Sequence, residues 1–324
     1  MNRKIRWGIA GLGKIAHKFA EDLKHVAQAE LVAVASTDGN RARAFQKDFE
    51  GQKAYDSYTD LYDDPEVELI YIASLNQNHK AMTMAALEAG KGVLCEKPLG
   101  LHPEEIQSMI GLAKKQNCFL MEGLWSRFNP AIIKTKEWID SGIIGVPRFL
   151  YAEFSFYLLN LDNHHRLMDP KKGGGVLLDI GVYPLFLAYL ILGRPKSIEA
   201  QSIFSPTGVD IQTSMILQYD NAQAVLYCGI ANESDNSAKV GGTEGGILLK
   251  GRWHNAQTVE LIQADESIKE DFPILGNGYI PQIEEVNRCI ISGKTESELW
   301  RHQDALELGL MVREVFEKIK KDTD

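Results

Sequence analysis

Two short polar elements in this sequence have residue types that can do acid–base chemistry. The segment Lys171 to Leu185 reads KKGGGVLLDIGVYPL, and it places one carboxylate, Asp179, and one phenol, Tyr183, in an otherwise apolar run. The two residues are four apart, so a regular helix would carry both side chains on one face. The element Cys95-Glu96-Lys97-Pro98-Leu99 adds an amine directly after an apolar strand pattern. Since an ammonium favours the ionised form of a nearby phenol, these residue types can together take a proton from an alcohol.

Each of these polar residues also has an ordinary structural explanation. Asp179 could cap the helix that follows the glycines, Tyr183 could be a core aromatic with its hydroxyl at the rim, and Lys97 before Pro98 could occupy a surface turn. Their occurrence together, in a chain that also carries a dinucleotide-binding pattern, favours a shared site. In that site we expect the three glycines to let substrate and nicotinamide approach the backbone.

A glycine-rich turn near the N-terminus has the spacing of a dinucleotide-binding loop. The residues Gly11-Leu12-Gly13-Lys14-Ile15-Ala16 form a G-x-G-x-x-A pattern between a predicted strand and a predicted helix. Gly11 permits the tight turn, Gly13 lets the backbone approach a pyrophosphate, and Ala16 lets the helix pack closely on the strand. The N-terminus of the helix would then face the phosphates.

The end of the second predicted strand bears on which dinucleotide binds. An NAD site usually has a carboxylate there, on the ribose hydroxyls, but this chain has Ser36 and Thr37, followed by Asp38 and Arg41. The two hydroxyls and the guanidinium of Arg41 suit a 2′-phosphate. We therefore expect NADP to be favoured over NAD, with Asp38 as the feature that would suit NAD and Arg41 open to a purely solvated role.

The elements that position these residues follow two different patterns along the chain. In the first 120 residues strands alternate with helices, which predicts βαβ units around a parallel sheet. The expected strands are 6–10, 30–35, 68–73, 92–95 and 119–121, and the expected helices are 14–25, 40–50, 79–89 and 103–116. After residue 124 come strands with short polar connections, at 148–158, 197–204, 211–219, 222–231, 246–250 and 258–263, and a closing helix at 297–318.

These patterns predict an α/β protein with two domains. We expect a Rossmann dinucleotide-binding domain at 1–123 and, at 124–324, an α+β domain with a large open, mainly antiparallel sheet. The second domain would bind substrate and mediate oligomerisation, and its last helix is free to pack back on the first domain.

Composition excludes several classes of partner. The net charge of −9 and the lack of a dense Lys/Arg block exclude binding to a nucleic-acid backbone. Four scattered cysteines without a C-x-x-C pair indicate free thiols in a reducing cytoplasm. The N-terminus resembles a first strand more than a signal peptide. The apolar stretch 176–193 contains Asp179 and Pro184, so a buried core helix is favoured over a membrane span.

Two motifs that end predicted strands extend the pattern to a known family. Leu75-Asn76-Gln77-Asn78-His79 follows the third strand, and Glu96-Lys97-Pro98 follows the fourth. With the glycine fingerprint and GGGVLLDIGVYP, they resemble the Gfo/Idh/MocA oxidoreductase family over essentially the whole chain. Within it, the chain is most similar to the branch of dimeric dihydrodiol dehydrogenases and NADP-dependent D-xylose dehydrogenases. The resemblance implies hydride exchange between a nicotinamide and a hydroxyl or hemiacetal carbon of a sugar, polyol or trans-dihydrodiol.

Carried onto this chain, the resemblance makes Lys97 the catalytic lysine and Asp179 and Tyr183 the second half of the site. A phenol of pKa about 10 is a poor base at neutral pH, so we expect Lys97 to favour the phenolate of Tyr183 and to polarise the substrate oxygen. Asp179 would orient Lys97 or a sugar hydroxyl. Many members of the family have histidine where Tyr183 stands, whereas the dihydrodiol branch has tyrosine.

The remaining candidates divide into cofactor and substrate contacts. His79 would contact nicotinamide or substrate, and Trp125 and Arg127 would line the cleft or, as an alternative of similar weight, pack at the domain boundary. His164 and Arg166 belong to a substrate-side loop, and no ligand spacing around them indicates a metal. The full set of expected cofactor residues is Gly11, Leu12, Gly13, Lys14, Ile15, Ala16, Ser36, Thr37, Arg41, Leu75, Asn76, His79, Glu96 and Lys97. Two departures from the family are Leu75, in place of a proline, and Thr37, where NADP-using relatives often have arginine.

The function expected is that of an NAD(P)-dependent dehydrogenase acting on CH–OH groups of a small molecule. The alternatives are an NAD-dependent glycosidase that works through transient oxidation and a non-catalytic NADP-binding regulatory protein on the same fold. An open sheet needs a cover, so we expect a homodimer or higher homo-oligomer formed through the C-terminal sheet. No nucleic-acid or membrane partner is expected.

Overall fold

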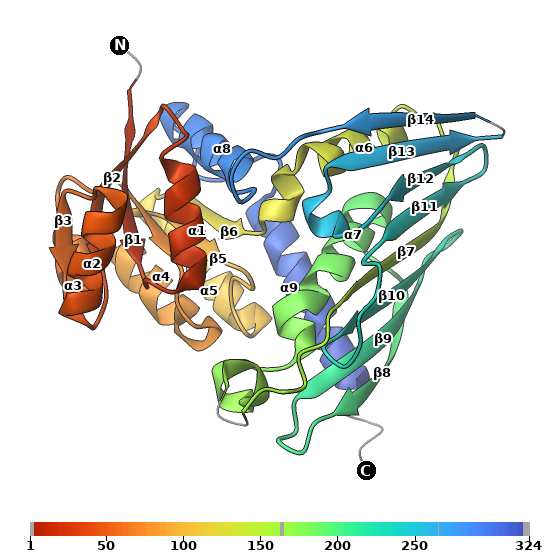
Figure 1. The fold of residues 1–324 in the computed structure, drawn as a ribbon, viewed down its shortest axis with the longest axis horizontal. Helices are drawn as coiled ribbons and strands as arrows, with labels where there is room; N and C mark the ends of the chain where they lie inside the picture. Colours follow the sequence, from red (N-terminus) through yellow and green to blue (C-terminus); the bar gives the residue numbers. More distant parts are fainter. Residues whose placement is uncertain (1–2, 163–164, 265, 320–324) are drawn as a thin grey trace. The chain divides into compact units, whose positions relative to one another are not determined.

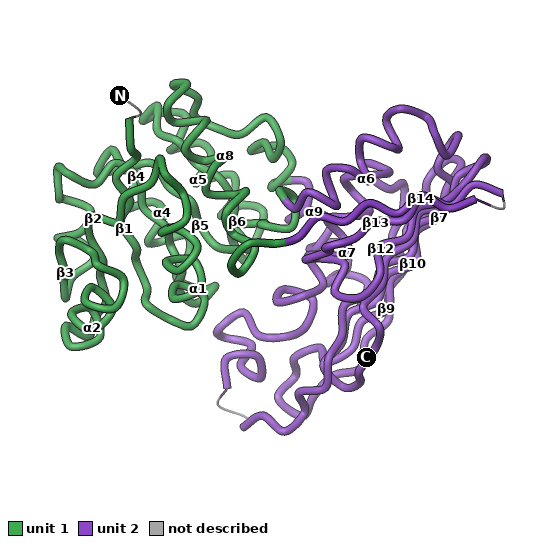
Figure 2. The backbone as a smooth tube through the Cα atoms, turned by 45° about the horizontal axis from the view of Figure 1, so that its top comes forward, with its two compact units in different colours: residues 1–128, 274–306 green, residues 129–273, 307–324 purple. Residues whose placement is uncertain are grey.

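The protein is divided into two compact units. The computed structural model describes residues 3–162, 165–264 and 266–319. Unit 1 comprises residues 1–128 and 274–306, and unit 2 comprises residues 129–273 and 307–324 (Figure 2). The sequence prediction placed a single boundary at 123/124 and did not include the return of 274–306 to the first unit.

Unit 1 is built on a six-stranded parallel sheet of order β3-β2-β1-β4-β5-β6 (Figure 1). The strands are β1 (Ile5–Ala10), β2 (Ala29–Ala35), β3 (Lys53–Tyr55), β4 (Leu69–Ile72), β5 (Gly92–Glu96) and β6 (Leu120–Gly123). The helices between them are α1 (Lys14–Leu23), α2 (Gly39–Phe49), α3 (Tyr58–Asp63), α4 (His79–Glu88) and α5 (Pro103–Gln116). This order confirms the Rossmann-type domain, and its short elements β3 and α3 were not predicted from the sequence. From β1 the chain first adds strands on one side of the sheet (β2, β3) and then, starting with β4, on the other side. A doubly wound sheet binds its ligand at this switch point, at the carboxyl ends of the strands.

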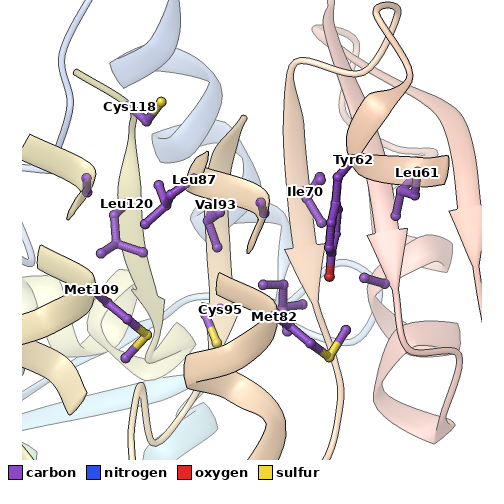
Figure 3. Close-up of a cluster of buried hydrophobic side chains, with 14 of the residues drawn as sticks. Leu61, Tyr62, Ile70, Met82, Leu87, Val93, Cys95, Met109, Cys118 and Leu120 are labelled. Atoms are coloured by element: carbon purple, nitrogen blue, oxygen red, sulfur yellow. The ribbon is translucent and has the colours of Figure 1, made fainter. Parts of the chain in front are cut away.

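The core of unit 1 explains why these strands pair as they do. Figure 3 shows Ile70, Val93 and Leu120, from three neighbouring strands, beside Met82 of α4 and Met109 of α5. All of these side chains are buried, and burying each of them fully contributes roughly 1.5–3 kcal/mol. Near-continuous apolar strands of this kind are typical of a parallel sheet that is covered on both faces.

The returning segment of unit 1 covers the β6 edge of the sheet. It contains α8 (Ile280–Ile291), where the Asn287 side chain accepts a hydrogen bond of 3.0 Å from the indole of Trp7 on β1. Farther along, the Leu120 N–H donates to the Thr295 carbonyl over 3.0 Å, and the His302 ring lies 3.0 Å from the Leu120 carbonyl. Residues 295–302, which we call the strap, therefore protect an edge strand that would otherwise expose its backbone.

Unit 2 is built on an eight-stranded sheet of order β14-β13-β12-β11-β7-β10-β9-β8. Neighbouring strands are antiparallel except for the parallel pair β7–β10, which confirms the mainly antiparallel sheet. The strands are β7 (Pro147–Ser155), β8 (Ser197–Phe204), β9 (Asp210–Gln218), β10 (Gln223–Gly229), β11 (Ala238–Gly242), β12 (Gly246–Leu249), β13 (Thr258–Gln263) and β14 (Glu266–Asp271). The unit's helices are α6 (Pro130–Asp140), α7 (Val182–Leu192) and most of α9 (His302–Ile319). Of these elements, β11, β14 and α6 were not predicted.

The two faces of the large sheet differ in exposure. Leu150, Met215 and Leu226 are buried on the face whose strands contact α6 and α7. Because side chains alternate along each strand, the neighbouring residues project from the other face. Five large apolar side chains there are 37–58% exposed: Phe149, Ile203, Ile216, Val225 and Ile262.

The apolar helical stretch of unit 2 begins irregularly. Residues Leu177–Gly181 form a π-helical turn, which continues into α7. Pro184 is the third residue of α7, directly after this turn, and it has no N–H to donate to the carbonyls of the preceding helical turn. The stretch Pro170–Leu192 is long and apolar enough to cross a membrane by length and composition, but 72% of its most apolar window is buried inside the protein. This burial agrees with the core helix expected.

Candidate active site

The glycine turn after β1 has the geometry of an anion-binding loop. Gly11 has φ +88°, and a Cβ there would lie 2.9 Å from the Ala73 carbonyl oxygen, so only glycine fits. A Cβ on Gly13 would meet no protein atom within 4 Å, and Gly13, as the N-cap of α1, has no side chain to occupy the helix N–H groups. Ala16 is completely buried, as close packing of the helix requires. The turn thus leaves space and backbone donors for a pyrophosphate.

In the loop after β2, Asp38 is the N-cap of α2. One carboxylate oxygen of Asp38 accepts hydrogen bonds from the backbone N–H groups of Asn40 (2.9 Å) and Arg41 (3.2 Å), which caps α2. Ser36 is buried, and its hydroxyl accepts from the Asp38 N–H over 3.2 Å. The side chain of Arg41 is 58% exposed, with one terminal nitrogen 3.9 Å from the second Asp38 oxygen. Asp38 therefore has a structural role that is independent of any nucleotide.

The loop after β4 is linked to the turn after β5 by a buried histidine. His79 opens α4 and has no exposed surface. Its Nδ1 lies 2.8 Å from the Pro98 carbonyl and its Nε2 lies 3.3 Å from the Ser74 carbonyl. Burial lowers the pKa of His79, and the two carbonyls offset this only in part. The structure thus places His79 between the two loops, whereas Leu75 is exposed and Asn76 begins a short 3₁₀ turn.

The turn that carries Lys97 is flanked by two buried carboxylates. Glu96 ends β5 and accepts hydrogen bonds from the Tyr71 hydroxyl (2.5 Å) and the Lys97 N–H (3.3 Å). Glu122, on the neighbouring strand β6, accepts from the Leu99 N–H over 2.9 Å. Lys97 itself is half-buried. The sequence prediction missed Glu122, although a carboxylate within the apolar run FLMEGLW was a usable signal.

Trp125 and Arg127 both contact the returning segment of unit 1. The Trp125 ring lies 5.4 Å from the Tyr279 ring, between centroids. Tyr279 is held in turn by Asp22, whose carboxylate accepts from the Tyr279 N–H over 2.7 Å. Arg127 is buried and donates to the Leu299 carbonyl over 2.8 Å. Packing within unit 1 is thus part of what both residues do.

In unit 2, Tyr183 lies in an aromatic cluster. Its side chain is 5% exposed, and its ring centroid is 5.4 Å from that of Phe154 on β7 and 5.6 Å from that of His254. Phe154 and His254 stack on each other, with centroids 4.0 Å apart. Neither residue was predicted, because both come from segments distant in sequence and no local pattern marks them.

Asp179 forms an ion pair with the loop that precedes it. An Arg166 guanidinium nitrogen lies 3.0 Å from an Asp179 oxygen, and the side chains are 40% and 16% exposed respectively. Asp179 is part of the π-helical turn, so it does not have the regular i,i+4 relation to Tyr183 that we expected. Turns of this kind are frequent at functional sites. His164 lies outside the described residues.

Two of the glycines before this turn, Gly174 and Gly175, are required by packing, a reason that the sequence prediction did not include. A Cβ on Gly174 would lie 2.7–2.8 Å from the carbonyl oxygens of residues 166, 167 and 169. Gly175 has φ +100°, and the space beside it is filled by the Asp210 carboxylate. That carboxylate accepts from the Leu177 N–H over 2.8 Å and so caps the helical stretch. The glycines therefore fix the start of the element that carries Asp179 and Tyr183.

The predicted site residues thus fall into two sets. Unit 1 gathers the glycine turn, His79, Glu96 and Lys97 at the carboxyl ends of its parallel strands. Unit 2 gathers Asp179, Tyr183 and Arg166 around the start of α7. The first set is suited to holding a dinucleotide, and the second offers a phenol and a paired carboxylate to a small polar molecule.

Comparison with protein families and known proteins assigns both units. Residues 5–124 match the model of the oxidoreductase family with an NAD-binding Rossmann fold, and residues 132–248 match the GFO/IDH/MocA C-terminal domain. The chain is 37% identical over 306 residues to a trans-1,2-dihydrobenzene-1,2-diol dehydrogenase of Mus musculus, with 90% of each chain covered. The Homo sapiens protein of that name is 33% identical over 333 residues, covering 98% of this chain and 96% of its own.

Solved structures share the fold of both units. KijD10, a 3-ketoreductase from Actinomadura kijaniata in complex with NADP, has a TM-score of 0.87 and 25% identity, with 98% of each chain covered. An aldose-aldose oxidoreductase from Caulobacter crescentus has a TM-score of 0.90 at 21% identity, covering 99% of this chain and 98% of its own. This chain therefore belongs to the Gfo/Idh/MocA family and is an NAD(P)-dependent oxidoreductase that acts on CH–OH groups.

Proposed function

We propose that this protein is an NADP-preferring dehydrogenase of trans-dihydrodiols or aldoses, in which Tyr183 is the acid–base residue and Lys97 assists it. The observation that carries the proposal is the retention of both half-sites in a chain 37% identical to a trans-1,2-dihydrobenzene-1,2-diol dehydrogenase. Lys97 stands at the carboxyl end of β5, the edge at which a Rossmann sheet presents residues to its nucleotide. Tyr183 opens a buried helix beside a paired carboxylate.

The preference for NADP rests on the residues after β2. One oxygen of Asp38 already accepts two hydrogen bonds as the cap of α2, and the other lies 3.9 Å from the Arg41 guanidinium. This favours a capping role for the carboxylate over the ribose-binding role that it has in an NAD site. Arg41, in the first turn of that helix, supplies an exposed guanidinium that suits a 2′-phosphate. KijD10 holds NADP in its crystal structure.

The proposed chemistry moves a proton and a hydride from one alcohol group. When bound, the nucleotide accepts the hydride at nicotinamide C4. The ionised Tyr183 takes the hydroxyl proton, which leaves the substrate as a carbonyl. Lys97 supplies the positive charge that favours the phenolate and stabilises charge developing on the substrate oxygen. Asp179, fixed by Arg166, orients a second hydroxyl of the substrate.

The surroundings of Tyr183 favour an unsaturated ring over an open polyol. Phe154 and His254 place aromatic surface beside the phenol, and aromatic faces bind flat, apolar rings well. The shared name of the Mus musculus and Homo sapiens relatives refers to a substrate of this kind. An aldose is the second substrate class because the same acid–base pair oxidises a hemiacetal carbon.

Nucleotide reduction measured by absorbance tests this proposal. Wild-type protein is assayed with trans-1,2-dihydrobenzene-1,2-diol and D-xylose, each with NADP and with NAD. We expect turnover with a lower KM for NADP than for NAD, and a loss of kcat of about 100-fold or more in Tyr183→Phe and in Lys97→Met, with NADP affinity unchanged in Tyr183→Phe. Wild-type turnover in Tyr183→Phe would remove the phenol from the mechanism.

We also propose that the protein is a cytoplasmic homodimer. The four cysteines are free and buried, which suits a reducing compartment. The exposed apolar side chains on one face of the unit 2 sheet would be covered by a second copy. Cell fractionation tests the first point, and solution mass tests the second.

A further inference from the structure

Glu122 is a buried carboxylate that joins the Lys97 turn to the strap. It is 3% exposed and lies on β6, directly beside Cys95 of β5 in the register of the two strands. One of its oxygens accepts from the Leu99 N–H over 2.9 Å, and the other accepts from the Trp300 indole N–H over 3.0 Å. It therefore fixes the backbone two residues after Lys97, using both oxygens and leaving no surface for substrate.

The charges around Glu122 connect it to the ammonium of Lys97. The Lys97 charge favours the ionised form of Glu122, and Glu96 opposes it. Burial is the largest influence and raises the pKa of Glu122 to about 7. The other titratable groups nearby are Cys95, whose thiol feels the Glu122 charge, and His302, which binds the Leu120 carbonyl on the same strand. Lys97 is thus a cation whose charge acts on this buried acid.

By the alternation of side chains, Glu96 and Glu122 project from opposite faces of the sheet. Cys95 and Glu122 are partners in register, so Glu96, one residue later, points the other way. Glu96 is held by the Tyr71 hydroxyl on its own face. The backbone of the turn is therefore hydrogen-bonded to one carboxylate on each face of the sheet. Glu96 accepts from the Lys97 N–H, and Glu122 accepts from the Leu99 N–H.

We propose that Glu122 is a positioning residue of the reaction, which holds the Lys97 turn through the Leu99 N–H and, in its ionised form, supplies a negative charge that opposes that of the Lys97 ammonium. The inference rests on the proposed role of Lys97 as the charge that favours the Tyr183 phenolate. Two consequences follow. Loss of the carboxylate misplaces the Lys97 ammonium, which lowers kcat. It also removes a negative charge that opposes the ammonium, so the ammonium then lowers the pKa of Tyr183 further.

The test compares three variants with a matched control by kcat, KM and pH profile. Glu122→Gln removes the charge but keeps the shape, Glu122→Asp keeps the charge but shortens the reach, and Lys97→Met removes the ammonium. The control is Glu285→Gln, because Glu285 is another buried carboxylate that holds the strap, at Ser297, without touching the Lys97 turn. All are assayed with NADP and with the substrate that wild type oxidises, and NADPH binding is followed by fluorescence.

We expect Glu122→Gln to lower kcat by about 10- to 100-fold, since small misplacements of a catalytic group cost this much, with KM for NADP within about threefold of wild type. The rising limb of its kcat profile should move to lower pH, whereas that of Lys97→Met should move to higher pH. Glu122→Asp should have a lower kcat than wild type, with the rising limb of its profile at the wild-type pH. Glu285→Gln should match wild type both in kcat and in the pH of this limb.

Three results would overturn the inference. They are a kcat within about twofold of wild type in Glu122→Gln, an unmoved profile in that variant, and an equal loss of kcat in Glu285→Gln, which would show a general effect of the strap. If Glu122→Gln does not fold and bind NADPH, the test rests on Glu122→Asp. A wild-type kcat in Glu122→Asp would then overturn the inference. Wild-type turnover in Lys97→Met would instead refute the proposed function from which the inference starts.

Discussion

At the scale of single residues, Glu122 makes folding stability depend on pH in a direction opposite to most carboxylates. Its pKa is raised by burial to about 7 from an ordinary value of 4.5, so the folded protein keeps this proton where the unfolded chain has lost it. The protonated form therefore contributes stability that is present below pH 4.5 and is lost as the pH rises to about 7. Over that window the loss is about 3 kcal/mol.

Urea unfolding of wild type and Glu122→Gln at pH 5 and pH 8 measures this contribution. The free energy of unfolding of wild type should fall relative to that of the variant by about 2–3 kcal/mol between the two conditions. Other titrating groups are common to both proteins and cancel in the comparison. A difference that is the same at both pH values would show that Glu122 does not titrate in this range.

Residues differ in how far their roles could be read from the sequence. Lys97 and Tyr183 could be singled out because each lies in a short motif, and their catalytic roles stay predictions. Gly11 and Gly13 could be singled out because their spacing has a local cause. Phe154, His254 and Glu122 act through contacts with residues far away in the sequence, which no short pattern records. The packing role of Gly174 and Gly175 could not be predicted, because the atoms beside them include the carboxylate of Asp210, which lies far away in the sequence.

At the scale of elements, the two glycines of the β1–α1 turn should respond differently to substitution. Gly11→Ala puts a Cβ at φ +88° and 2.9 Å from the Ala73 carbonyl oxygen, so it should cost about 1–3 kcal/mol of stability as well as nucleotide binding. At Gly13 the backbone has φ −85° and a Cβ meets open space, so Gly13→Ala should leave stability nearly unchanged. Its methyl group would occupy the space proposed for the pyrophosphate.

Thermal unfolding without nucleotide, together with NADPH titration followed by fluorescence, separates these effects. We expect Gly13→Ala to melt within about 2 °C of wild type but to bind NADPH at least tenfold more weakly. Gly11→Ala should melt several degrees lower. Tight NADPH binding by Gly13→Ala would mean that the pyrophosphate does not approach this backbone.

Elements were predicted well where a local pattern sets them and poorly where tertiary contacts do. The alternation of apolar strands and helices was enough to predict the strands β1, β2, β4, β5 and β6 and the helices α1, α2, α4 and α5. The short elements β3 and α3 have too few residues to show a period. The π turn at Leu177–Gly181 was taken for regular helix, because its apolar composition does not distinguish the two.

At the scale of the whole molecule, the class of each sheet, one parallel and one mainly antiparallel, followed from the sequence, but the strand orders and the assignment of the returning segment did not. Residues 274–306 join unit 1 through contacts such as Trp7 with Asn287, which are separated by 280 positions. Amphipathic pattern predicts that a helix such as α8 packs, but not against which sheet. A single boundary was therefore the simplest division that the sequence allowed.

The exposed face of the unit 2 sheet leads to a prediction about assembly. Ile216 and Val225 are directly opposite each other on β9 and β10 and are 51% and 37% exposed. Together with Phe149, Ile203 and Ile262 they place five exposed large apolar side chains among polar ones on the outer face of the eight-stranded sheet. A second copy of the chain would bury this surface around a two-fold axis, and a charge placed at Ile216 would then be buried on both copies at a large cost.

Size-exclusion chromatography with light scattering tests this assembly. Wild type should have twice the chain mass of 36.2 kDa, and Ile216→Asp should have the mass of one chain. Ile268→Asp is the matched control, because Ile268 is 53% exposed on β14 but is paired with the buried Leu261, on the other face of the sheet. The control should remain dimeric. A wild-type mass of 36.2 kDa, or equal dissociation of both variants, would show that this face is not the dimer interface, and the apolar side chains on it would then need a different partner to cover them.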